Sequence, residues 1–428
     1  MAAGLDIAAG AIGIAATAFT SAVQVYGFIS TALDLQRDAP ISFWKLRIEE
    51  IRLRSWGRFW GYDNGSMDSY LEQEHLVEDV RGILNQIKAL LEDSVKFTDR
   101  YGLTVEGALA ASTTSSSSSS SSDPNSSTRP GLQKNWPRKF KWALADKKKF
   151  EVLVADLKTL NDGLFGLLRF RELSTINQIA NSSVLRAANS TNDVSFMKEA
   201  CLENQNQSAD DSTFLASWER PAYNELIRGA GSKYLVLQQS RQIVVPSGIA
   251  APAPVQPTLL REASLMTGFS NLSATRVLAQ YQARAVLVEW KEVDASKPNQ
   301  RLISQRVEDL AQFLSTDSPK PDGFRALGCL GYFHDQGRSR LGYIFELPLH
   351  VATKPPCSLF DFLARDGENT LLADLGDRFA IARSISAAMM RLHDCGWVHT
   401  AFRSEAVVFF YHGQVWTPLP VLICVVHS

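Results

Sequence analysis

The sequence predicts a multidomain protein in which an all-α helical bundle precedes an α+β domain. Apolar residues recur at helical spacing through the first half, four prolines interrupt the chain at 246–257, and β-like runs followed by helices come after them. We therefore expect a bundle over 1–228, a linker over 229–258 and an α+β domain over 259–428. The 428 residues, 45% apolar and 21% charged, are enough for two such domains. The mixed charges, with a net charge of −1, argue against nucleic acid as a partner.

The first segment of the bundle carries no charged side chain from Ile7 to Leu33. As a helix it would be about 40 Å long, which is enough to cross a hydrocarbon core of ~30 Å. Its many small and hydroxyl residues make insertion marginal, so a buried helix, a permanent anchor and a signal peptide all stay open. We favour a buried helix that inserts conditionally. The candidate inserting residues are its larger apolar side chains: Ile7, Ile12, Ile14, Phe19, Val23, Val25, Phe28, Ile29 and Leu33.

Three further helices of the bundle are predicted by apolar stripes with steps of three and four. The second helix runs from Ile41 to Arg58, before the turn signal at 63–65. The third carries Leu76, Val80, Ile83, Ile87 and Leu90, and a later one carries Phe150, Leu153, Leu157, Leu160, Leu164 and Leu167, directly after the basic run at 147–149.

The serine tract is the least structured part of the predicted bundle. Residues 112–131 include eight consecutive serines and almost no apolar side chains, so we expect a disordered loop. A short helix over 214–228 is expected to close the bundle before the linker.

The second half begins with strand patterns and continues with helices. Residues 284–293 read as a strand, 305–314 as a helix, and 327–333 with 341–347 as a hairpin around 335–337. A short helix over 358–365 and a long one over 375–395 follow. In the long helix we expect five residues to face inward: Phe379, Ile385, Ala388, Met389 and Leu392.

This order of elements, with Lys291 in the strand and Glu308 in the helix, resembles a protein kinase from its third strand to its catalytic loop. The stretch from Val398 to Val407 aligns through His399 with H-R-D-L-x-x-x-N. Ala401 then replaces the catalytic aspartate and Ala406 the metal-binding asparagine. The resemblance therefore implies a pseudokinase, not an enzyme.

Cofactor binding is not expected, although ATP binding stays open. Gly268 alone stands where a glycine-rich loop would cover phosphates, and no D-F-G follows, so the resemblance implies a truncated C-lobe. Lys291 and Glu308 are the vestigial candidates for cofactor binding. They could form a strand-to-helix ion pair or could both be solvated.

Parts of the first half resemble the HeLo domain of fungal cell-death and prion-associated proteins. The resemblance is carried by the uncharged N-terminus, by the run from Arg52 to Gly61 (RLRSWGRFWG), and by the run from Lys141 to Phe150 (KWALADKKKF). The second half is similar to the degenerate kinase-like domains fused to HeLo domains. The resemblance implies a bundle that is triggered to release its first helix into membranes.

We therefore expect a cytoplasmic, non-enzymatic effector or relay of regulated cell death or incompatibility. Its partners would be membrane lipid on activation, further copies of the chain, or an upstream signalling protein, and it could move to the plasma membrane. A signalling adaptor that never permeabilises membranes, or a kinase homologue that binds nucleotide weakly, remain the alternatives.

Overall fold

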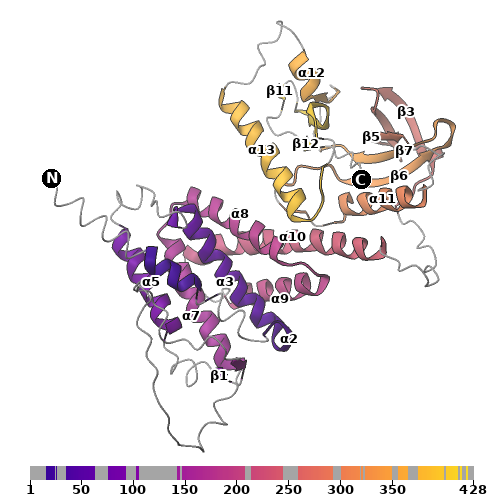
Figure 1. The fold of residues 1–428 in the computed structure, drawn as a ribbon. Helices are drawn as coiled ribbons and strands as arrows, with labels where there is room; N and C mark the ends of the chain where they lie inside the picture. The colour runs from indigo at the N-terminus through magenta and orange to yellow at the C-terminus, as the bar shows by residue number, and fades with distance from the viewer. Residues whose placement is uncertain are drawn as a thin grey trace, which may run out of the picture. The chain divides into compact units, whose positions relative to one another are not determined.

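The computed structural model divides the chain into two units, Met1–Val184 with Glu199–Glu219 and Leu185–Lys198 with Arg220–Ser428 (Figure 1). Within them the structure describes residues 16–24, 26, 35–62, 76–92, 103–105, 142–144, 147–207, 214–243, 259–292, 300–318, 320–321, 323–348, 355–364, 375–399, 402–412, 415–416 and 421–422. The chain thus passes from a helical region to a region with an antiparallel sheet and helices, as predicted. The predicted disordered loop at 112–131 lies outside the described residues.

Helices form the core of the first unit. After the helical residues 16–24 and 26, these are α2 (Leu35–Asp38), α3 (Pro40–Phe59), α5 (Val77–Glu92), α7 (Lys147–Gly166), α8 (Phe170–Ala187) and α9 (Thr191–Gln207), the last two shared with the second unit. The predicted stripes are confirmed, since Val80 and Ile87 of α5 and Leu153 and Leu157 of α7 are buried together. A two-stranded pair, β1 (Leu103–Val105) with β2 (Trp142–Leu144), was not predicted.

Helix α3 occupies a central place in this core. Pro40 stands in its first turn, where a missing N–H costs nothing, and Gly61 follows its end at a positive φ of 75° that suits glycine. Its buried apolar residues include Trp44, Ile48 and Trp56. It also buries charged side chains, among them Glu49 and Arg52.

Helix α10 (Phe214–Ile243) is longer than predicted, and the expected helix end at Arg228 is wrong. Two contacts within the second unit explain the extension. Gly229 lies so close to Leu185 that a β-carbon would be 2.7 Å from Leu185 Cδ1, and Gln239 Nε2 donates to the Asp309 carbonyl at 3.0 Å. Packing of this kind outweighs the low helix propensity of the glycines.

The second unit contains a five-stranded antiparallel sheet of order β3-β4-β5-β7-β6. Its strands are β3 (Met266–Asn271), β4 (Arg276–Tyr281), β5 (Arg284–Glu292), β6 (Cys329–Asp335) and β7 (Arg340–Glu346), with α11 (Gln300–Leu314) between β5 and β6 in the sequence and beside β6 in Figure 1. The predicted strand at 284–293 and the predicted hairpin are confirmed. Strands β3 and β4 were not predicted.

Each face of the sheet has its own apolar cluster. Leu287 of β5 packs with α11 and with Tyr343 of β7, whereas Val286, Val288 and Trp290 pack on the opposite face. This alternation follows from the period of two in a strand. The faces are called below the helix face, which contacts α11, and the outer face.

Shorter elements complete the second unit. They are β8 (Cys357–Ser358), α12 (Leu359–Ala364), α13 (Leu375–Asp394), β9 (Val407–Phe409), β10 (Tyr411–His412), β11 (Val415–Trp416) and β12 (Val421–Leu422). The long helix is confirmed, but the inward position predicted for Phe379 is wrong, because its side chain is 68% exposed. Ala388 and Leu392, further along α13, are buried as predicted.

Candidate functional site

The described part of the N-terminal segment is a helix stored in the core of the first unit. Ala18, Phe19, Ala22 and Tyr26 are buried and so share one face. Thr20 on the opposite face is exposed, and its hydroxyl donates to the Ala16 carbonyl at 2.9 Å. The segment therefore has a buried apolar face and an uncharged, water-facing side.

This helix packs against the part of α3 that contains Trp56 and Gly57. A β-carbon added to Gly57 would overlap the phenyl ring of Phe19, so only glycine lets this ring reach its place. The ring of Tyr62 lies 5.5 Å from that of Phe19 and 5.3 Å from that of Trp56, between ring centroids. Aromatic contacts of this kind add to the apolar area that is buried.

Two of the predicted inserting residues lie in this part of the structure. Phe19 is buried, and Val23 packs against the same core. The other seven lie outside the described residues: Ile7, Ile12, Ile14, Val25, Phe28, Ile29 and Leu33. In the described parts of the chain, we find no helix with the length and apolar character needed to cross a bilayer.

A buried ionic cluster lies in the same unit, formed by Glu49 and Arg52 of α3, Lys158 and Asp162 of α7, and Glu219 of α10. Arg52 Nη1 donates to both carboxylate oxygens of Glu49, at 3.0 and 2.9 Å, and its Nη2 donates to Asp162 Oδ1 at 2.7 Å. Lys158 Nζ donates to Asp162 Oδ2 at 2.6 Å and to Glu219 Oε1 at 2.8 Å. The cluster thus connects three helices and holds three carboxylates against two cations.

Two acids of the ionic cluster, Asp162 and Glu219, have pKa values that are shifted in opposite directions. Burial raises the pKa of Glu219, against the opposing charge of Arg52. Burial acts in the same direction on Asp162, but there the charges of Arg52 and Lys158 outweigh it and hold the pKa below its ordinary value. Asp162 is therefore the firmly ionised member, and Glu219 is the member that takes up a proton more readily.

The stored helix reaches this ionic cluster through Tyr26, which is fully buried. Burial and then the negative charge of Glu49 raise the pKa of its hydroxyl, and the side chain of Asn161 opposes this rise. Asn161 Nδ2 in turn donates to the Glu49 backbone carbonyl at 3.0 Å and to Glu49 Oε2 at 2.9 Å. The cluster was not predicted, although pairs of opposite charges at helical spacing beside apolar stripes, such as Glu49 with Arg52, are a usable signal.

In the second unit, the two predicted cofactor residues are Lys291 on β5 and Glu308 on α11. Desolvation and the positive charge of Arg306 lower the pKa of Lys291. Glu308 accepts hydrogen bonds from the backbone N–H of Leu259 at 3.4 Å and from Gln312 Nε2 at 2.9 Å. The ion pair between Lys291 and Glu308 stays a prediction.

Sequence reasoning missed a buried carboxylate on the helix face of β5. Glu289 lies two residues before Lys291 and pairs across the strands with Arg276, with 3.6 Å between Glu289 Oε2 and Arg276 Nε. Burial, opposed by Arg276, raises the pKa of Glu289 to about 7. Arg276 Nη1 also donates to the backbone carbonyl of Glu405. A charged residue in the apolar run Val286–Trp290 is the signal that could have revealed it.

The residues aligned with the catalytic loop lie near this contact. Ala406 is buried at the end of a 3₁₀ turn, Ser404–Ala406, whereas Ala401 lies outside the described residues. His399 is buried, and its ring packs edge-on against Phe402 with 5.7 Å between centroids. Arg276 therefore fastens β4 to the turn that contains Ala406.

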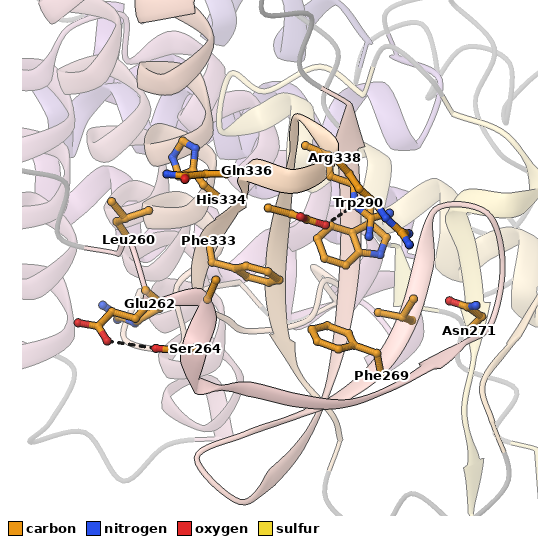
Figure 2. Close-up of a pocket in the computed structure, with 15 residues that line it drawn as sticks. Leu260, Glu262, Ser264, Phe269, Asn271, Trp290, Phe333, His334, Gln336 and Arg338 are labelled. Carbon is orange, nitrogen blue, oxygen red and sulfur yellow. Dashed lines mark hydrogen bonds and ion pairs between the residues drawn. The ribbon is translucent and has the colours of Figure 1, made fainter.

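A groove of about 1040 Å³ is open on the outer face of the sheet (Figure 2). Phe269, Trp290 and Phe333 supply its aromatic surface, and Arg338 and Arg340 lie at one end. Neither Lys291 nor Glu308 is among the residues that line it. The groove is therefore separate from the predicted cofactor residues.

Comparison with known proteins bears on the first half of the chain. No curated protein matches the sequence. Residues 6–197 match the model of the HeLo family, described as prion-inhibition and propagation.

Proposed function

We propose that the protein is a non-enzymatic effector or relay of regulated cell death or incompatibility. In the resting state the N-terminal helix is stored in the bundle. On activation by self-association or by an upstream protein, the population shifts to a form in which this helix leaves the bundle and inserts into a membrane. The resting protein is cytoplasmic and moves to the plasma membrane when activated.

One observation carries this proposal: the contact of Phe19 with Gly57, within residues that match the HeLo model. The segment 7–33 is long enough to span a bilayer and has no charge to desolvate. In the bundle its apolar face is covered by aromatic side chains of α3. A segment that suits both surroundings can serve as a conditional membrane anchor.

We further propose that the second unit is an inactive kinase-like regulator. Its strand, helix, hairpin and long helix follow one another in the order that the resemblance implies. Ala406 supplies no ligand for Mg²⁺, and Glu289 places a carboxylate near the position where a kinase uses a lysine on phosphate. These features support a signalling or restraining role without phosphoryl transfer.

The test uses the full chain carrying Gly57→Ala, which weakens the packing of Phe19 of the stored helix against α3. Dye release is measured from liposomes of phosphatidylcholine and phosphatidylserine. Thr20 lies at the middle of segment 7–33 and is exposed in the bundle, so Thr20→Asp leaves the stored state intact but costs about 2.5–3.5 kcal/mol on insertion. We expect Thr20→Asp to abolish leakage and the uncharged control Thr20→Val to preserve it.

Other outcomes separate the proposal from its rival. Equal leakage with aspartate and with valine at this position would show that the segment does not enter the bilayer. A Gly57→Ala chain that leaves liposomes intact, while a protein partner binds it saturably, would instead identify an adaptor that does not permeabilise membranes.

A further inference from the structure

The groove on the outer face of the sheet has a fixed wall. The backbone of Leu259–Arg261 runs beside β6, where Arg261 N donates to the Tyr332 carbonyl at 2.7 Å and Tyr332 N donates to the Leu259 carbonyl at 2.9 Å. This close approach requires Gly331, because a β-carbon there would lie 2.5 Å from the Leu259 carbonyl oxygen. The groove is therefore bounded by paired backbone.

Its surface offers three aromatic rings. Trp290 and Phe333 meet edge-on with 5.4 Å between centroids, and Phe269 lies 6.2 Å from Trp290. Phe269 is 49% exposed, whereas Trp290 and Phe333 are buried in the floor. A flat, apolar group can lie against the exposed ring of Phe269 at the mouth of the groove.

The floor also holds a hydrogen-bond donor that no described residue satisfies. Trp290 is only 6% exposed, and its Nε1 has no acceptor in the described parts of the chain. Other buried indoles share this property, but Trp290 lines an open groove. A ligand with an acceptor atom would therefore remove the cost of leaving this donor unpaired.

One end of the groove is basic. The guanidinium of Arg340 lies 3.7 Å from the centroid of a Trp290 ring and is held there by Asp335, with 2.9 Å between Nε and Oδ2. Arg338, on the adjoining turn, is exposed and forms no ion pair with any described acid. Figure 2 shows Arg338 beside Trp290, whereas Glu262 lies at the opposite end, hydrogen-bonded to Ser264 at 3.3 Å.

We propose that this groove binds a small planar aromatic molecule that carries an anionic group. The ring would lie against Phe269, Trp290 and Phe333, and the anionic oxygens would accept from Arg338 and from the Trp290 indole. The volume is close to that of small-molecule pockets, about 300–1000 Å³. This inference does not depend on the proposed cell-death function.

The edge strand beside the groove argues against a peptide added as a further strand. The register of β3 shifts between Thr267 and Ser270, and Gly268 has a φ of +64°. A bulge of this kind interrupts the regular row of backbone groups that strand addition uses. A compact ligand suits the site better than an extended chain.

The experiment titrates naphthalene-2-sulfonate into the full chain by isothermal calorimetry. Arg338→Ala should weaken binding about threefold to fivefold by removing an exposed charge, and Trp290→Phe should weaken it about fivefold by removing one donor while keeping a ring. Arg284→Ala is the matched control, because Arg284 is an exposed arginine at the start of β5 that does not line the groove. It should bind as the unaltered chain does.

Four results would overturn the proposal. The first is that naphthalene-2-sulfonate does not bind the unaltered chain saturably, and the second is that it binds Arg338→Ala and Arg284→Ala with equal affinity. The third is that the cation protonated 2-naphthylmethylamine binds the unaltered chain as tightly as the sulfonate does. The fourth is that the peptide acetyl-Glu-Trp-Glu-amide binds whereas the free sulfonate does not. The exposed position of Arg338 keeps the test decisive even if Trp290→Phe perturbs the sheet.

Discussion

The phenyl ring of Phe19 occupies the space that a β-carbon on residue 57 would need, so Gly57 and the stored helix depend on each other. Gly57 lies in the last turn of α3, where it remains helical and is not among the glycines with a positive φ. The absence of a side chain is therefore required by the partner helix and not by the backbone of α3.

Gly57→Ala should lower the free energy of unfolding by about 1–3 kcal/mol, because the new methyl group overlaps the Phe19 ring. The measurement is thermal denaturation of the full chain followed by circular dichroism. Gly82→Ala in α5 is the control: a β-carbon there meets nothing within 4 Å, and alanine should stabilise the helix by about 0.5–1 kcal/mol.

Adding Phe19→Ala to Gly57→Ala should cost less than the two separate effects together, since the small side chain relieves the overlap. If Gly57→Ala were as stable as Gly82→Ala, the close contact would play no part in storing the helix.

The two acids that face Lys158 should respond differently to neutralisation at pH 7. Asp162→Asn should destabilise the protein by about 1.5–3 kcal/mol, because Arg52 and Lys158 lose a charged partner in a buried place. Glu219→Gln should cost less, because burial raises the pKa of Glu219 and its ionised form is the less favoured of the two. Urea denaturation at pH 7 tests the order, and a larger loss for Glu219→Gln would contradict it.

Asp162 and Glu219 should also make opposite contributions to the pH dependence of stability. The lowered pKa of Asp162 gives a stabilisation that is present above its unfolded value, about 3.9, and is lost as pH falls through the folded value. The raised pKa of Glu219 instead reduces stability as pH rises above its unfolded value, about 4.3. The destabilisation by Asp162→Asn should therefore shrink on acidification below about pH 4.

Glu289 should make the second unit less stable as pH rises from about 4.5 to about 7, because the folded protein binds its proton more tightly in this interval. Glu289→Gln should remove this dependence and raise stability at pH 8 by up to about 3 kcal/mol. Melting temperatures at pH 5 and pH 8 provide the measurement.

The control for Glu289 is Glu292→Gln, at the exposed end of the same strand. This change should leave the pH dependence as it is. If Glu289→Gln and Glu292→Gln gave the same profile, Glu289 would not be the group that titrates.

Mg²⁺ with ATP should leave the melting temperature of the full chain unchanged, since a ligand stabilises a protein only by binding its folded state. The carboxylate of Glu289 and the side chain of Ala406 are the physical reasons. Incubation with radiolabelled ATP should yield no phosphate transfer. Transfer that is lost in Lys291→Ala would contradict the inactive assignment.

The elements that the sequence predicted are those whose burial follows one period. The stripes of α5 and α7 and the hairpin of β6 and β7 contain apolar residues at regular steps, so local pattern and tertiary packing agree. The sequence also contains the signals for a buried first helix, because the uncharged segment that includes Phe19 and the tryptophan-glycine run of α3 can both be identified in it.

The remaining features depend on contacts between distant parts of the sequence. Helix α10 continues past Gly229 because Leu185 packs against that glycine, and no local signal contains that contact. Glu219 meets Lys158 across 61 positions, and Arg276 meets the Glu405 carbonyl across 129. Such pairs are fixed by topology, which a single sequence does not reveal.

The ionic cluster lies on α3, α7 and α10, and the stored segment contributes no charge to it. If the first helix left the bundle, the ion pairs of Arg52 and Lys158 with their carboxylate partners would therefore remain. The buried apolar face of the described helix would be transferred from one apolar environment to another, and Ser21 and Tyr26 would carry buried polar groups with it. Because segment 7–33 carries no charged side chain, its insertion avoids the cost of burying an ion, which is among the largest barriers to entering a bilayer.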